Sequence, residues 1–331
     1  MLEIVLCTDE NYVMPTSVLM TSIGLTNPDL SIHYNIVSTK LGQEFKDKLS
    51  RHLGNEHSSI SFYSLDESYL KDCPIRPGEH VSLATYIRLF LPSILPQNID
   101  KVLYIDGDVI CLDSIKELCE TPLADYSSAA APDMRCNDIR ILNRLSLPKD
   151  SDYFNAGIML INLKWWREND IQRKALQYIA ENQDVCQYHD QDALNVLLHG
   201  HIAELPIRYN LQEHFFEPLK DQFISQNRFE ELQAALSNPT LIHYTGFRKP
   251  WHRECVNPLK SVWLFFYQKT EWRNTKLGFR HKGFRLFKYR LREKIANYGL
   301  MTSKNIYKGM DFSEIQQAVM NKVKSKVVPN N

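Results

Sequence analysis

The chain has 331 residues, 44% of them hydrophobic, so it is long enough to bury a sizeable core as one large domain or two. Its seven cysteines include no Cys-x-x-Cys pair and fit neither a disulfide framework nor a zinc ribbon, so we expect a protein of the reducing cytosol. The net charge of zero hides a segregation, because residues 1–268 carry a net charge of −11 and residues 269–331 carry +11, which indicates an anionic partner for the basic end.

The first hundred residues alternate strand-like and helical segments. Residues 3–8, 31–38 and 58–63 predict strands, and residues 41–53 predict a helix. Because the chain enters the first strand at once, with an early acid, we expect no secretory signal peptide. Strands spaced by helices of this length imply right-handed βαβ units and a mainly parallel sheet, in which ligands bind beyond the carboxyl ends of the strands. The segment Thr8-Asp-Glu-Asn11 lies at such an end.

Residues 101–113 hold the most informative pattern. An apolar, β-branched run delivers Asp106 and Asp108 at the end of a predicted buried strand, and residues i and i+2 of an extended chain point to the same side. Two neighbouring carboxylates repel unless a cation lies between them, so the pair suggests a divalent metal that shares its coordination with a diphosphate. Solvated loop carboxylates are the commoner explanation of a single Asp-x-Asp, and the chain has two more, at residues 150–152 and 190–192.

Two later segments place polar groups among apolar ones. Residues 83–92 predict a helix that ends at Pro92 and carries Arg88, an arginine that is either packed by its stem with its head in water or aimed at an anion. Residues 153–162 predict a second buried strand. Its opening segment, Asn155-Ala-Gly157, has a glycine that either allows close packing or lets a sugar approach the backbone.

The rest of the first 255 residues adds helices and a polar loop. Residues 163–182 predict a helix, and another begins at residues 189–195, where acids in the first turn are most often caps. Residues 241–252 predict a strand that runs into a Gly/Pro loop. There His243 is either a packing residue or a neutral imidazole that binds a metal, while Gly246 and Lys249 would suit a phosphate.

Six motifs therefore follow one another along the chain: Thr8-Asp9-x-Asn11-Tyr12, Thr85-Tyr-x-Arg88, Leu103-Tyr-x-Asp106-x-Asp108, Phe154-Asn-Ala-Gly157, Asp190-Gln-Asp192 and His243-Tyr-x-Gly246-x-x-Lys249-Pro-Trp-His252. In this order and spacing they resemble glycosyltransferase family 8, the retaining transferases grouped with bacterial lipopolysaccharide α-galactosyl- and α-glucosyltransferases and, more distantly, with glycogenin. The resemblance runs from about residue 3 to residue 255. It implies an α/β fold of the GT-A type, with a Rossmann-like, mainly parallel sheet flanked by helices. Residues 1–260 would form the catalytic domain, and residues 261–331 a basic, helical C-terminal extension.

The resemblance also implies roles, with a UDP-hexose as donor and Mn²⁺ or Mg²⁺ as cofactor. The implied metal ligands are Asp106, Asp108 and His243. The implied nucleotide contacts are Cys7, Thr8, Asp9, Asn11, Tyr12, Asp106, Gly107, Gly246 and Lys249. The implied donor-sugar contacts are Arg88, Asp133, Asn155, Ala156, Asp190 and Gln191. Asp190 and Gln191 are also the implied catalytic residues.

The reaction implied is transfer of galactose or glucose, with retention, to lipopolysaccharide or another cell-surface glycan. Retention could proceed by double displacement or through a tight ion pair on the leaving-group face. The amide of Gln191 is a poor nucleophile, so we favour the ion pair, with Gln191 and Asp190 stabilising positive charge. The chain departs from relatives at Gly107, His189, Thr245 and Phe247, which puts acceptor identity in doubt more than activity.

The basic tail, residues 273–294, carries nine basic residues and one acid, interleaved with aromatic and aliphatic side chains. This pattern suits an anionic membrane surface or a nucleic acid, and a merely solvated helix would leave the aromatic residues unexplained. We favour peripheral attachment to the inner face of the cytoplasmic membrane and expect no nucleic-acid partner, since the body of the chain is acidic. The longest uniformly apolar run, residues 262–267, is far shorter than the roughly 20 residues of a transmembrane helix.

Two other classes compete with this interpretation. A phosphatase with an Asp-x-Asp nucleophile would carry its motif on the first strand, whereas here about a hundred residues precede it. An inactive UDP-sugar or carbohydrate-binding module of the same fold would not need a metal triad together with the lysine. We therefore expect an active, metal-dependent hexosyltransferase.

Overall fold

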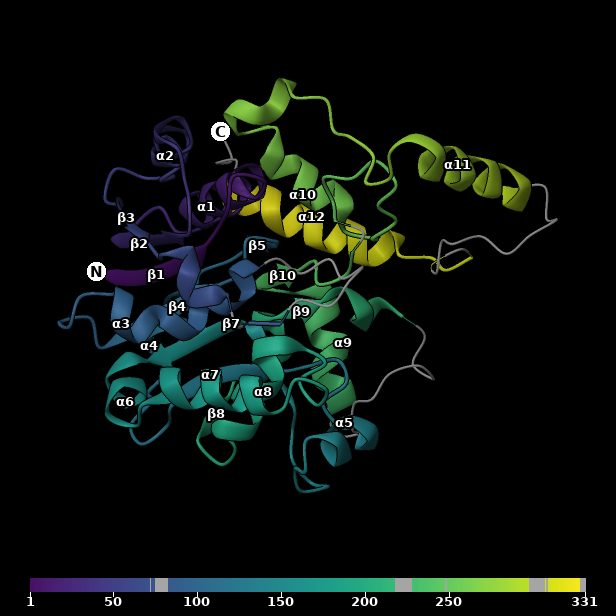
Figure 1. Ribbon diagram of the computed structural model, residues 1–331. Helices are drawn as coiled ribbons and strands as arrows, with labels where there is room; N and C mark the ends of the chain where they lie inside the picture. Colours follow the sequence, from purple (N-terminus) through teal and green to yellow (C-terminus); the bar gives the residue numbers. More distant parts are fainter. Residues whose placement is uncertain are drawn as a thin grey trace.

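The fold is built around a large central sheet that lies among helices in Figure 1. The computed structural model describes the chain except for residues 72, 75–82, 218–227, 248, 298–306, 308 and 328–331. Within the described residues this sheet has seven strands in the order β3-β2-β1-β4-β7-β6-β8. The strands are β1 (Leu2–Cys7), β2 (Ile32–Ser38), β3 (Ser59–Ser64), β4 (Lys101–Ile105), β6 (Ser128–Pro132), β7 (Phe154–Asn162) and β8 (Ile202–Glu204).

The sheet is mainly parallel, as the βαβ spacing predicts. β3, β2, β1 and β4 run parallel to one another, and β6 is parallel to β8. β7 is antiparallel to both of its neighbours, β4 and β6. Its near-continuous burial is typical of a strand covered on both faces, and such a run of apolar residues carries no information on strand direction.

Helices cover both faces of the central sheet. Successive strand residues such as Leu103 and Tyr104 belong to different hydrophobic clusters, because their side chains alternate between the two faces. On the Tyr104 face lie η2 (Leu83–Phe90), α3 (Leu91–Ile94), α6 (Leu163–Glu168), α7 (Ile171–Glu181) and α8 (His189–Leu197). On the Leu103 face lie α1 (Val13–Thr26), α2 (Gln43–Ser50) and α4 (Lys116–Glu120).

A small second sheet positions Asp108 and His243, two of the predicted metal ligands. Its order is β5-β10-β9, with β5 spanning Val109–Cys111, β9 Leu211–Gln212 and β10 Leu241–His243. β10 is antiparallel to β5 and pairs His243 with Val109. Because β5 follows β4 after a three-residue turn, this register brings His243 next to the turn that contains both aspartates.

The remaining elements connect or surround these sheets. They are η1 (Glu67–Leu70), α5 (Ile139–Arg144), η3 (Ile207–Tyr209), η4 (Glu213–Phe216), α9 (Phe229–Ser237), α10 (Lys260–Tyr267), η7 (Glu271–Asn274), α11 (Gly283–Asn297) and α12 (Ser313–Val327). Among the described residues, no helix has the length and apolar character needed to cross a lipid bilayer.

Two helix predictions differ from the structure. The single helix expected over residues 163–182 is two helices, because Asp170 between them adopts a left-handed backbone with φ of 53°. The segment around Arg88 is a 3-10 helix followed by the short α3, and Pro92 lies inside α3 rather than after the helix. A proline in the first turn of a helix costs nothing, because the N–H it lacks has no partner there.

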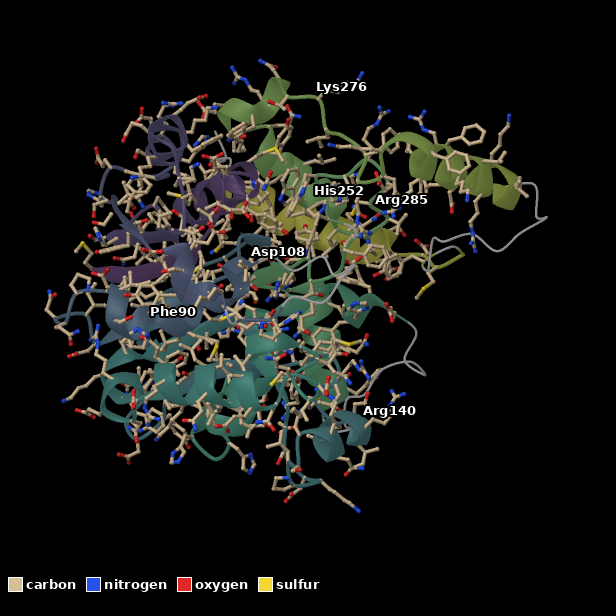
Figure 2. The ribbon with its side chains drawn as sticks, viewed as in Figure 1. Phe90, Asp108, Arg140, His252, Lys276 and Arg285 are labelled. Atoms are coloured by element: carbon tan, nitrogen blue, oxygen red, sulfur yellow. The ribbon has the colours of Figure 1, made fainter. Side chains whose placement is uncertain are left out.

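The C-terminal residues differ among themselves in their packing. α12 and α10 belong to the cluster around the small sheet, in which Val319, Val323 and Trp263 are fully buried. α11 projects away from the sheets, and Phe284 and Phe287 on it are more than half exposed. Figure 2 places Arg285 on this outlying helix, far from Asp108 near the middle of the molecule. The division at residue 260 stays a prediction.

Candidate active site

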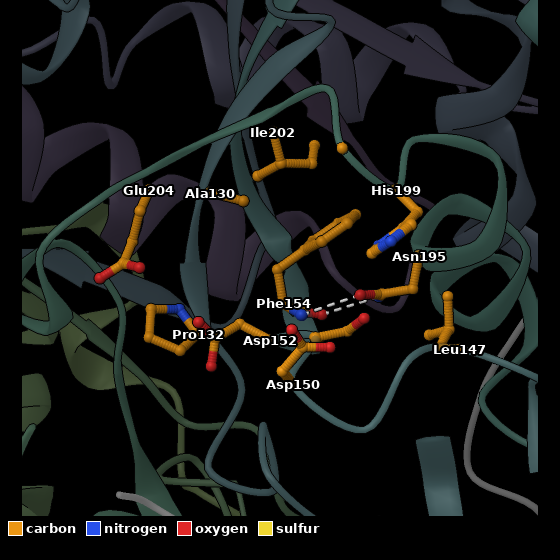
Figure 3. Close-up of a pocket in the computed structure, with 12 residues that line it drawn as sticks. Ala130, Pro132, Leu147, Asp150, Asp152, Phe154, Asn195, His199, Ile202 and Glu204 are labelled. Carbon is orange, nitrogen blue, oxygen red and sulfur yellow. Dashed lines mark hydrogen bonds between the residues drawn. The ribbon is translucent and has the colours of Figure 1, made fainter. Parts of the chain in front are cut away.

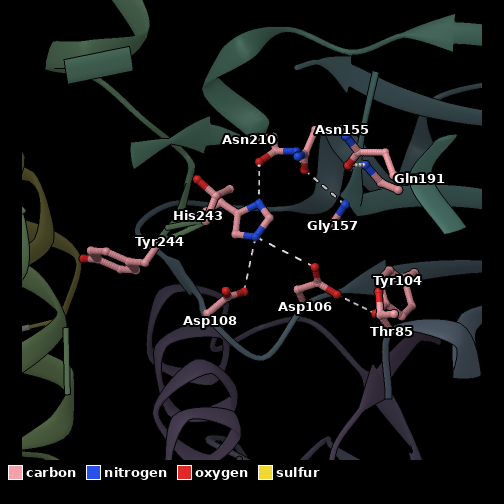
Figure 4. Close-up of polar contacts among 12 residues, drawn as sticks. Thr85, Tyr104, Asp106, Asp108, Asn155, Gly157, Gln191, Asn210, His243 and Tyr244 are labelled. Atoms are coloured by element: carbon pink, nitrogen blue, oxygen red, sulfur yellow. Dashed lines mark hydrogen bonds and ion pairs between the residues drawn. The ribbon is translucent and has the colours of Figure 1, made fainter. Parts of the chain in front are cut away.

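The three predicted metal ligands meet where the central sheet gives way to the small one. Asp106 follows β4, Asp108 precedes β5 and His243 ends β10. One carboxylate oxygen from each aspartate and one ring nitrogen of His243 all lie within 4.8 Å of one another. His243 Nε2 is 3.2 Å from Asp108 Oδ1 and 3.8 Å from Asp106 Oδ2 (Figure 4). The three side chains therefore converge, as a shared metal site would require.

The donor set fits a divalent cation. Asp108 Oδ1 is buried and has no hydrogen-bond partner among the described residues, although an imidazole nitrogen lies beside it. Burial raises the pKa of Asp108, but the charge of Lys249 and the neighbouring His243 ring outweigh that effect and lower it, which keeps the carboxylate ionised. Two carboxylates and one imidazole are a ligand set compatible with Mn²⁺ and Mg²⁺.

Gly157 leaves the room that His243 occupies. A Cβ atom on residue 157 would lie 2.2 Å from His243 Cε1 and 2.7 Å from Asp106 Oδ2, so a larger residue would collide with two of the three ligands. The backbone of Gly157 also holds Asp106 in place, since the amide of Asp106 donates to its carbonyl at 2.8 Å. Of the two roles open to this glycine from the sequence, packing or sugar approach, the structure shows packing, against two of the predicted metal ligands.

Arg88 joins Asp106 to Asp190. Its Nη2 is 3.1 Å from Asp106 Oδ1 and its Nε is 2.9 Å from Asp190 Oδ2. The guanidinium is buried, lies 4.5 Å from the centre of the Tyr104 ring and donates to the carbonyl of Ala156. The two open alternatives for Arg88 are thereby decided, because its head lies in the interior against anionic groups.

Asp190 is deeply buried in this arrangement. Its Oδ1 accepts a hydrogen bond of 2.7 Å from the Thr85 hydroxyl, while its Oδ2 faces Arg88. Desolvation raises the pKa of Asp190, and the charge of Arg88 opposes that shift. An acid at the start of α8 was most easily explained as a helix cap, but this carboxylate contacts Thr85 and Arg88 from another element.

The remaining predicted sugar residues form one hydrogen-bonded cluster. Asp133 Oδ2 accepts from Asn155 Nδ2 at 3.0 Å and from Gln191 Nε2 at 3.3 Å. Gln191 Oε1 in turn accepts from the backbone N–H of Ala156 at 3.0 Å. The structure therefore brings all the predicted donor-sugar residues together, with the first residues of β7 in the middle.

The predicted nucleotide residues lie at the end of β1. Cys7 and Thr8 are buried, and Asp9 Oδ1 accepts from the backbone N–H groups of Asn11 and Tyr12, which orders the entry into α1. The Asn11 side chain is exposed. Burial raises the pKa of Tyr12 to about 12, and its ring packs edge-on against Trp251 of the loop after β10.

That loop carries the two residues predicted to contact the diphosphate. Lys249 Nζ forms an ion pair with Asp108 and donates to the Tyr244 carbonyl at 2.7 Å. Gly246 lies against Glu213, because a Cβ added there would be 2.7 Å from Glu213 Oε2. Gly107 faces α1, where an added Cβ would be 3.2 Å from Thr16 Oγ1 and 3.3 Å from Tyr12 Cδ1. Arg248 lies outside the described residues.

Sequence reasoning missed several residues that complete the site. Asn210 Oδ1 lies 3.0 Å from His243 Nδ1, the Tyr104 hydroxyl donates to Asp106 at 2.5 Å, and Tyr153 contacts Gln191 through its hydroxyl at 3.1 Å. Tyr104 and Thr85 fall inside quoted motifs, so their position was a usable signal. Asn210 follows a short 3-10 turn without any motif, and the sequence offers no signal for it.

A cavity of about 260 Å³ lies beside the sugar residues (Figure 3). It is lined by Pro132 and Phe154, the chain neighbours of Asp133 and Asn155, and by Asn195. The Asn195 amide binds both the N–H and the carbonyl of Phe154 and donates to the Gln191 carbonyl. This wall of the cavity therefore fixes the start of β7 relative to α8.

Comparison with known proteins identifies the family. Residues 3–255 match Glycosyl transferase family 8. The lipopolysaccharide 1,2-glucosyltransferase of Escherichia coli K12 is 30% identical over 80% of this chain and 77% of its own length, and the lipopolysaccharide 1,3-galactosyltransferase of Salmonella typhimurium is 26% identical over 81% and 78%.

A solved structure agrees with this match. The galactosyltransferase LgtC in complex with donor and acceptor sugar analogues superposes with a TM-score of 0.73, at 27% identity, over 82% of this chain and 99% of LgtC. The predicted α/β fold of the GT-A type is therefore confirmed. The chain belongs to glycosyltransferase family 8.

Proposed function

We propose that this glycosyltransferase transfers a hexose, galactose or glucose, from a UDP-sugar to lipopolysaccharide or another cell-surface glycan, with retention and with a divalent metal. The observation that carries the proposal is the Asp106, Asp108 and His243 group, which is joined through Arg88 to the buried Asp190. A metal site and a sugar-binding carboxylate linked by one arginine suit a substrate in which a diphosphate and a sugar are neighbours.

The proposed reaction leaves new negative charge on the diphosphate, so positive charge beside it would stabilise the leaving group. Asp106, Asp108 and His243 would hold Mn²⁺ or Mg²⁺, which when bound would stabilise the charge that develops on the leaving diphosphate. Lys249 is within reach of the same place, since its amine already contacts Asp108. Cys7, Thr8, Asp9, Asn11 and Tyr12 would contact the nucleoside at the end of β1, with Gly107 and Gly246 at the diphosphate.

The sugar residues support the ion-pair route. Both carboxylate oxygens of Asp190 are engaged, one by Thr85 and one by Arg88, so the group is poorly free to attack an anomeric carbon. Gln191 presents an amide whose oxygen accepts from the Ala156 N–H. We infer that Asp190 and Gln191 stabilise positive charge on the sugar while a diphosphate oxygen takes the proton of the acceptor. A glycosyl adduct trapped on Asp190 would overturn this route.

The acceptor is proposed by analogy. The similar proteins named above include a lipopolysaccharide 1,2-glucosyltransferase and a lipopolysaccharide 1,3-galactosyltransferase, so both hexoses occur among relatives of comparable identity. Phe247, at the mouth of the loop after β10, is 49% exposed and lies under the guanidinium of Arg280. Because Phe247 is also one of the positions at which this chain departs from its relatives, we propose that this loop helps to select the acceptor.

We also propose that α11 attaches the protein to an anionic membrane surface on the cytoplasmic side. Phe284, Phe287 and Leu291 are exposed at helical spacing, and the first two rings stack on each other. Each basic residue near an anionic leaflet contributes about 1 kcal/mol, so the nine in residues 273–294 are ample for salt-sensitive binding.

Point variants test the membrane proposal more cleanly than truncation. Deleting everything after residue 268 would also remove α12, whose Val319 and Val323 are buried in the core. A Phe284→Ser/Phe287→Ser variant should bind anionic vesicles more weakly than the unchanged protein, while Phe265→Ser, on α10, should not. Equal binding by the double variant would remove α11 as the attachment site.

The proposed reaction is tested by release of UDP from a panel of nucleotide sugars, with Mn²⁺, with Mg²⁺ and with EDTA. We expect slow, metal-dependent hydrolysis of one UDP-hexose, abolished in an Asp106→Asn/Asp108→Asn variant. UDP binding with metal but without turnover of any donor, even with lipopolysaccharide acceptors present, would favour an inactive sugar-binding module. Absence of UDP binding would contradict the proposal altogether.

A further inference from the structure

We propose that Asn210 is a positioning residue that holds the His243 imidazole with its proton on Nδ1, so that Nε2 is free to bind the metal. The proposal rests on the metal site of the proposed function, but it concerns a residue outside every sequence motif. Asn210 itself is fully buried and contacts neither aspartate, so it would act only through His243.

A backbone N–H fixes the orientation of the Asn155 side-chain amide. The N–H of Gly157 donates to the Asn155 side chain at 3.1 Å. A backbone N–H can only donate, so the atom of Asn155 that it meets must be the carbonyl oxygen, Oδ1. The orientation of this amide, which coordinates alone cannot distinguish, is thereby fixed by its partner.

The contact made by the Asn155 NH₂ group supports the same orientation of the amide. Its Nδ2 lies 3.0 Å from Asp133 Oδ2, and an ionised carboxylate can only accept. Asp133 also receives the N–H of Arg135 on Oδ1 and the amide of Gln191 on Oδ2, so three donors surround it. Turning the Asn155 amide over would place its NH₂ group against the Gly157 N–H and its oxygen against Asp133, two unfavourable contacts at once.

The Asn155 oxygen in turn fixes the orientation of the Asn210 amide. The Asn155 Oδ1 atom that receives the Gly157 N–H also lies 2.9 Å from Asn210, and two oxygens cannot share a hydrogen bond without a proton, so Asn210 faces it with Nδ2. Asn210 Oδ1 is then left to face His243 Nδ1, at 3.0 Å. Because this oxygen can only accept, the His243 proton must lie on Nδ1 (Figure 4).

A proton on Nδ1 determines the state of the opposite ring nitrogen, Nε2. In the neutral imidazole Nε2 then carries no proton, and it directs a lone pair toward Asp108 Oδ1 at 3.2 Å and Asp106 Oδ2 at 3.8 Å. Two carboxylate oxygens and an unprotonated ring nitrogen that face one another repel, and a cation between them removes that repulsion. The Gly157 N–H thus determines, through two buried amides, which nitrogen of His243 is available for the metal.

Because the amides of Asn155 and Asn210 are buried, the loss of one hydrogen bond between them is not replaced by water. Asn210 has no exposed surface, and Asn155 and His243 are 7% and 4% exposed, so water has little access to replace a lost partner. Partners of this kind, bound to the second nitrogen of a metal-binding histidine, typically change metal affinity 10- to 100-fold when they are removed.

The test uses the metal-free protein with ¹⁵N-labelled histidine. Long-range ¹H–¹⁵N NMR spectra, recorded at rising pH until one ring nitrogen of His243 loses its proton, report which nitrogen keeps it. The His243 signals are assigned by their absence in a His243→Gln variant. We expect the unchanged protein to show Nδ1 protonated. We expect Asn210→Leu to show Nε2 protonated, because that nitrogen can then donate to Asp108, and to bind Mn²⁺ at least 10-fold more weakly by electron paramagnetic resonance.

Two further variants separate positioning from folding. Asn210→Asp keeps an acceptor for His243 Nδ1 but loses the donor to Asn155, so it should unfold more easily and yet retain the Nδ1 proton. Asn35→Leu is the matched control, since Asn35 is equally buried on β2 and donates to Glu3, far from the site. It should lose stability without any change in the His243 signals or in Mn²⁺ binding.

Either of two results would overturn the inference. One is an Nε2 proton on His243 in the unchanged protein. The other is an Asn210→Leu variant that folds and keeps both the tautomer and the Mn²⁺ affinity. Failure of the proposed function would look different, because a protein that binds no Mn²⁺ could still show the Nδ1 proton and its loss in Asn210→Leu.

Discussion

The amine of Lys249 forms an ion pair with Asp108, one of the three groups that face each other at the predicted metal site. Burial lowers the pKa of this lysine, but Asp108 outweighs that effect and raises it, so the amine is charged. Lys249 therefore already neutralises one of the carboxylates that a divalent cation would use. Metal binding and the position of Lys249 are coupled through a single carboxylate.

Replacing this lysine should strengthen metal binding in the absence of nucleotide. In a Lys249→Met variant, Mn²⁺ no longer competes with an amine for Asp108, so its dissociation constant should fall several-fold. UDP should bind more weakly in the same variant, because a positive charge near the diphosphate is lost. Titration of Mn²⁺ by electron paramagnetic resonance, with and without UDP, measures both effects.

Lys260→Met serves as the control for Lys249, since Lys260 donates to the carbonyls of His252 and Arg253 at the other side of the loop. It should leave the Mn²⁺ affinity unchanged. Weaker Mn²⁺ binding by Lys249→Met would show that the lysine supports the metal site instead of competing with the metal.

Adding one methyl group at Gly157 should disable the metal site. A Cβ there would lie 2.2 Å from His243 Cε1 and 2.7 Å from Asp106 Oδ2, so His243 must leave its position. We expect Gly157→Ala to lose Mn²⁺ binding measured by calorimetry and to lose donor hydrolysis with it. Gly278→Ala is the control, because nothing lies within 4 Å of a Cβ at that position. Normal Mn²⁺ binding by Gly157→Ala would mean that His243 is not a ligand.

The meeting of the three predicted metal ligands followed from the family resemblance, and a strand end could be assigned to each of them from the sequence alone. Asp106 and Asp108 follow an apolar run, and His243 closes another, and strand ends in such a fold gather at one edge. The antiparallel direction of β7 could not be predicted, since a strand buried on both faces is apolar throughout and reads the same in either direction.

Other features depend on contacts that are remote in sequence. Asn210 is 33 residues from His243, and the short 3-10 turn that precedes it resembles any surface loop in composition. The break at Asp170 within a helical pattern likewise depends on a left-handed backbone that aspartate adopts only when its surroundings favour it. Hydrophobic periodicity predicts which face of a helix or strand is buried. It carries no information on a single side-chain contact between distant segments or on the backbone conformation of one residue.

Removal of Arg88 should destabilise the protein strongly. Arg88→Met leaves Asp106 and Asp190 without the cation that joins them, and loss of one partner from a buried ion pair costs about 3–5 kcal/mol. The free energy of unfolding, measured by urea titration, should fall by about 3–5 kcal/mol. Since burial already raises the pKa of Asp190, the deficit should be smallest at low pH, where this carboxyl is protonated, and should grow as the pH rises.

Arg173→Met is the comparison for Arg88, because its ion pair with Asp170 is exposed and such pairs contribute about 0–1 kcal/mol. A loss for Arg88→Met no larger than this would show that the buried carboxylates are neutralised by protonation. Arg88→Lys should recover only part of the stability, since a single amine cannot contact two carboxylates in the way that a guanidinium fork does.

The attachment of α12 to the body should weaken in acid. Asp113, just after β5, lies 2.8 Å from Lys322 Nζ and 2.9 Å from Lys326 Nζ on that helix. Burial raises the pKa of Asp113, but the hydrogen bonds from the two lysines outweigh it and lower the pKa to about 2. A lowered pKa means that stability is fully present above the unfolded value of 3.8 and is lost as the pH falls toward 2.

The contribution of Asp113 is isolated by comparison with Asp113→Asn. At neutral pH the variant should be less stable than the unchanged protein by about 1 kcal/mol, less than the whole pKa shift corresponds to, because Asp113 and Lys326 are partly exposed and water screens the ion pairs. Between pH 4 and pH 2 the urea midpoints of the two proteins should converge, since protonation removes the same charge that the substitution removes. Midpoints that stay equally far apart across that range would mean that Asp113 acts by packing and that its charge does not hold α12.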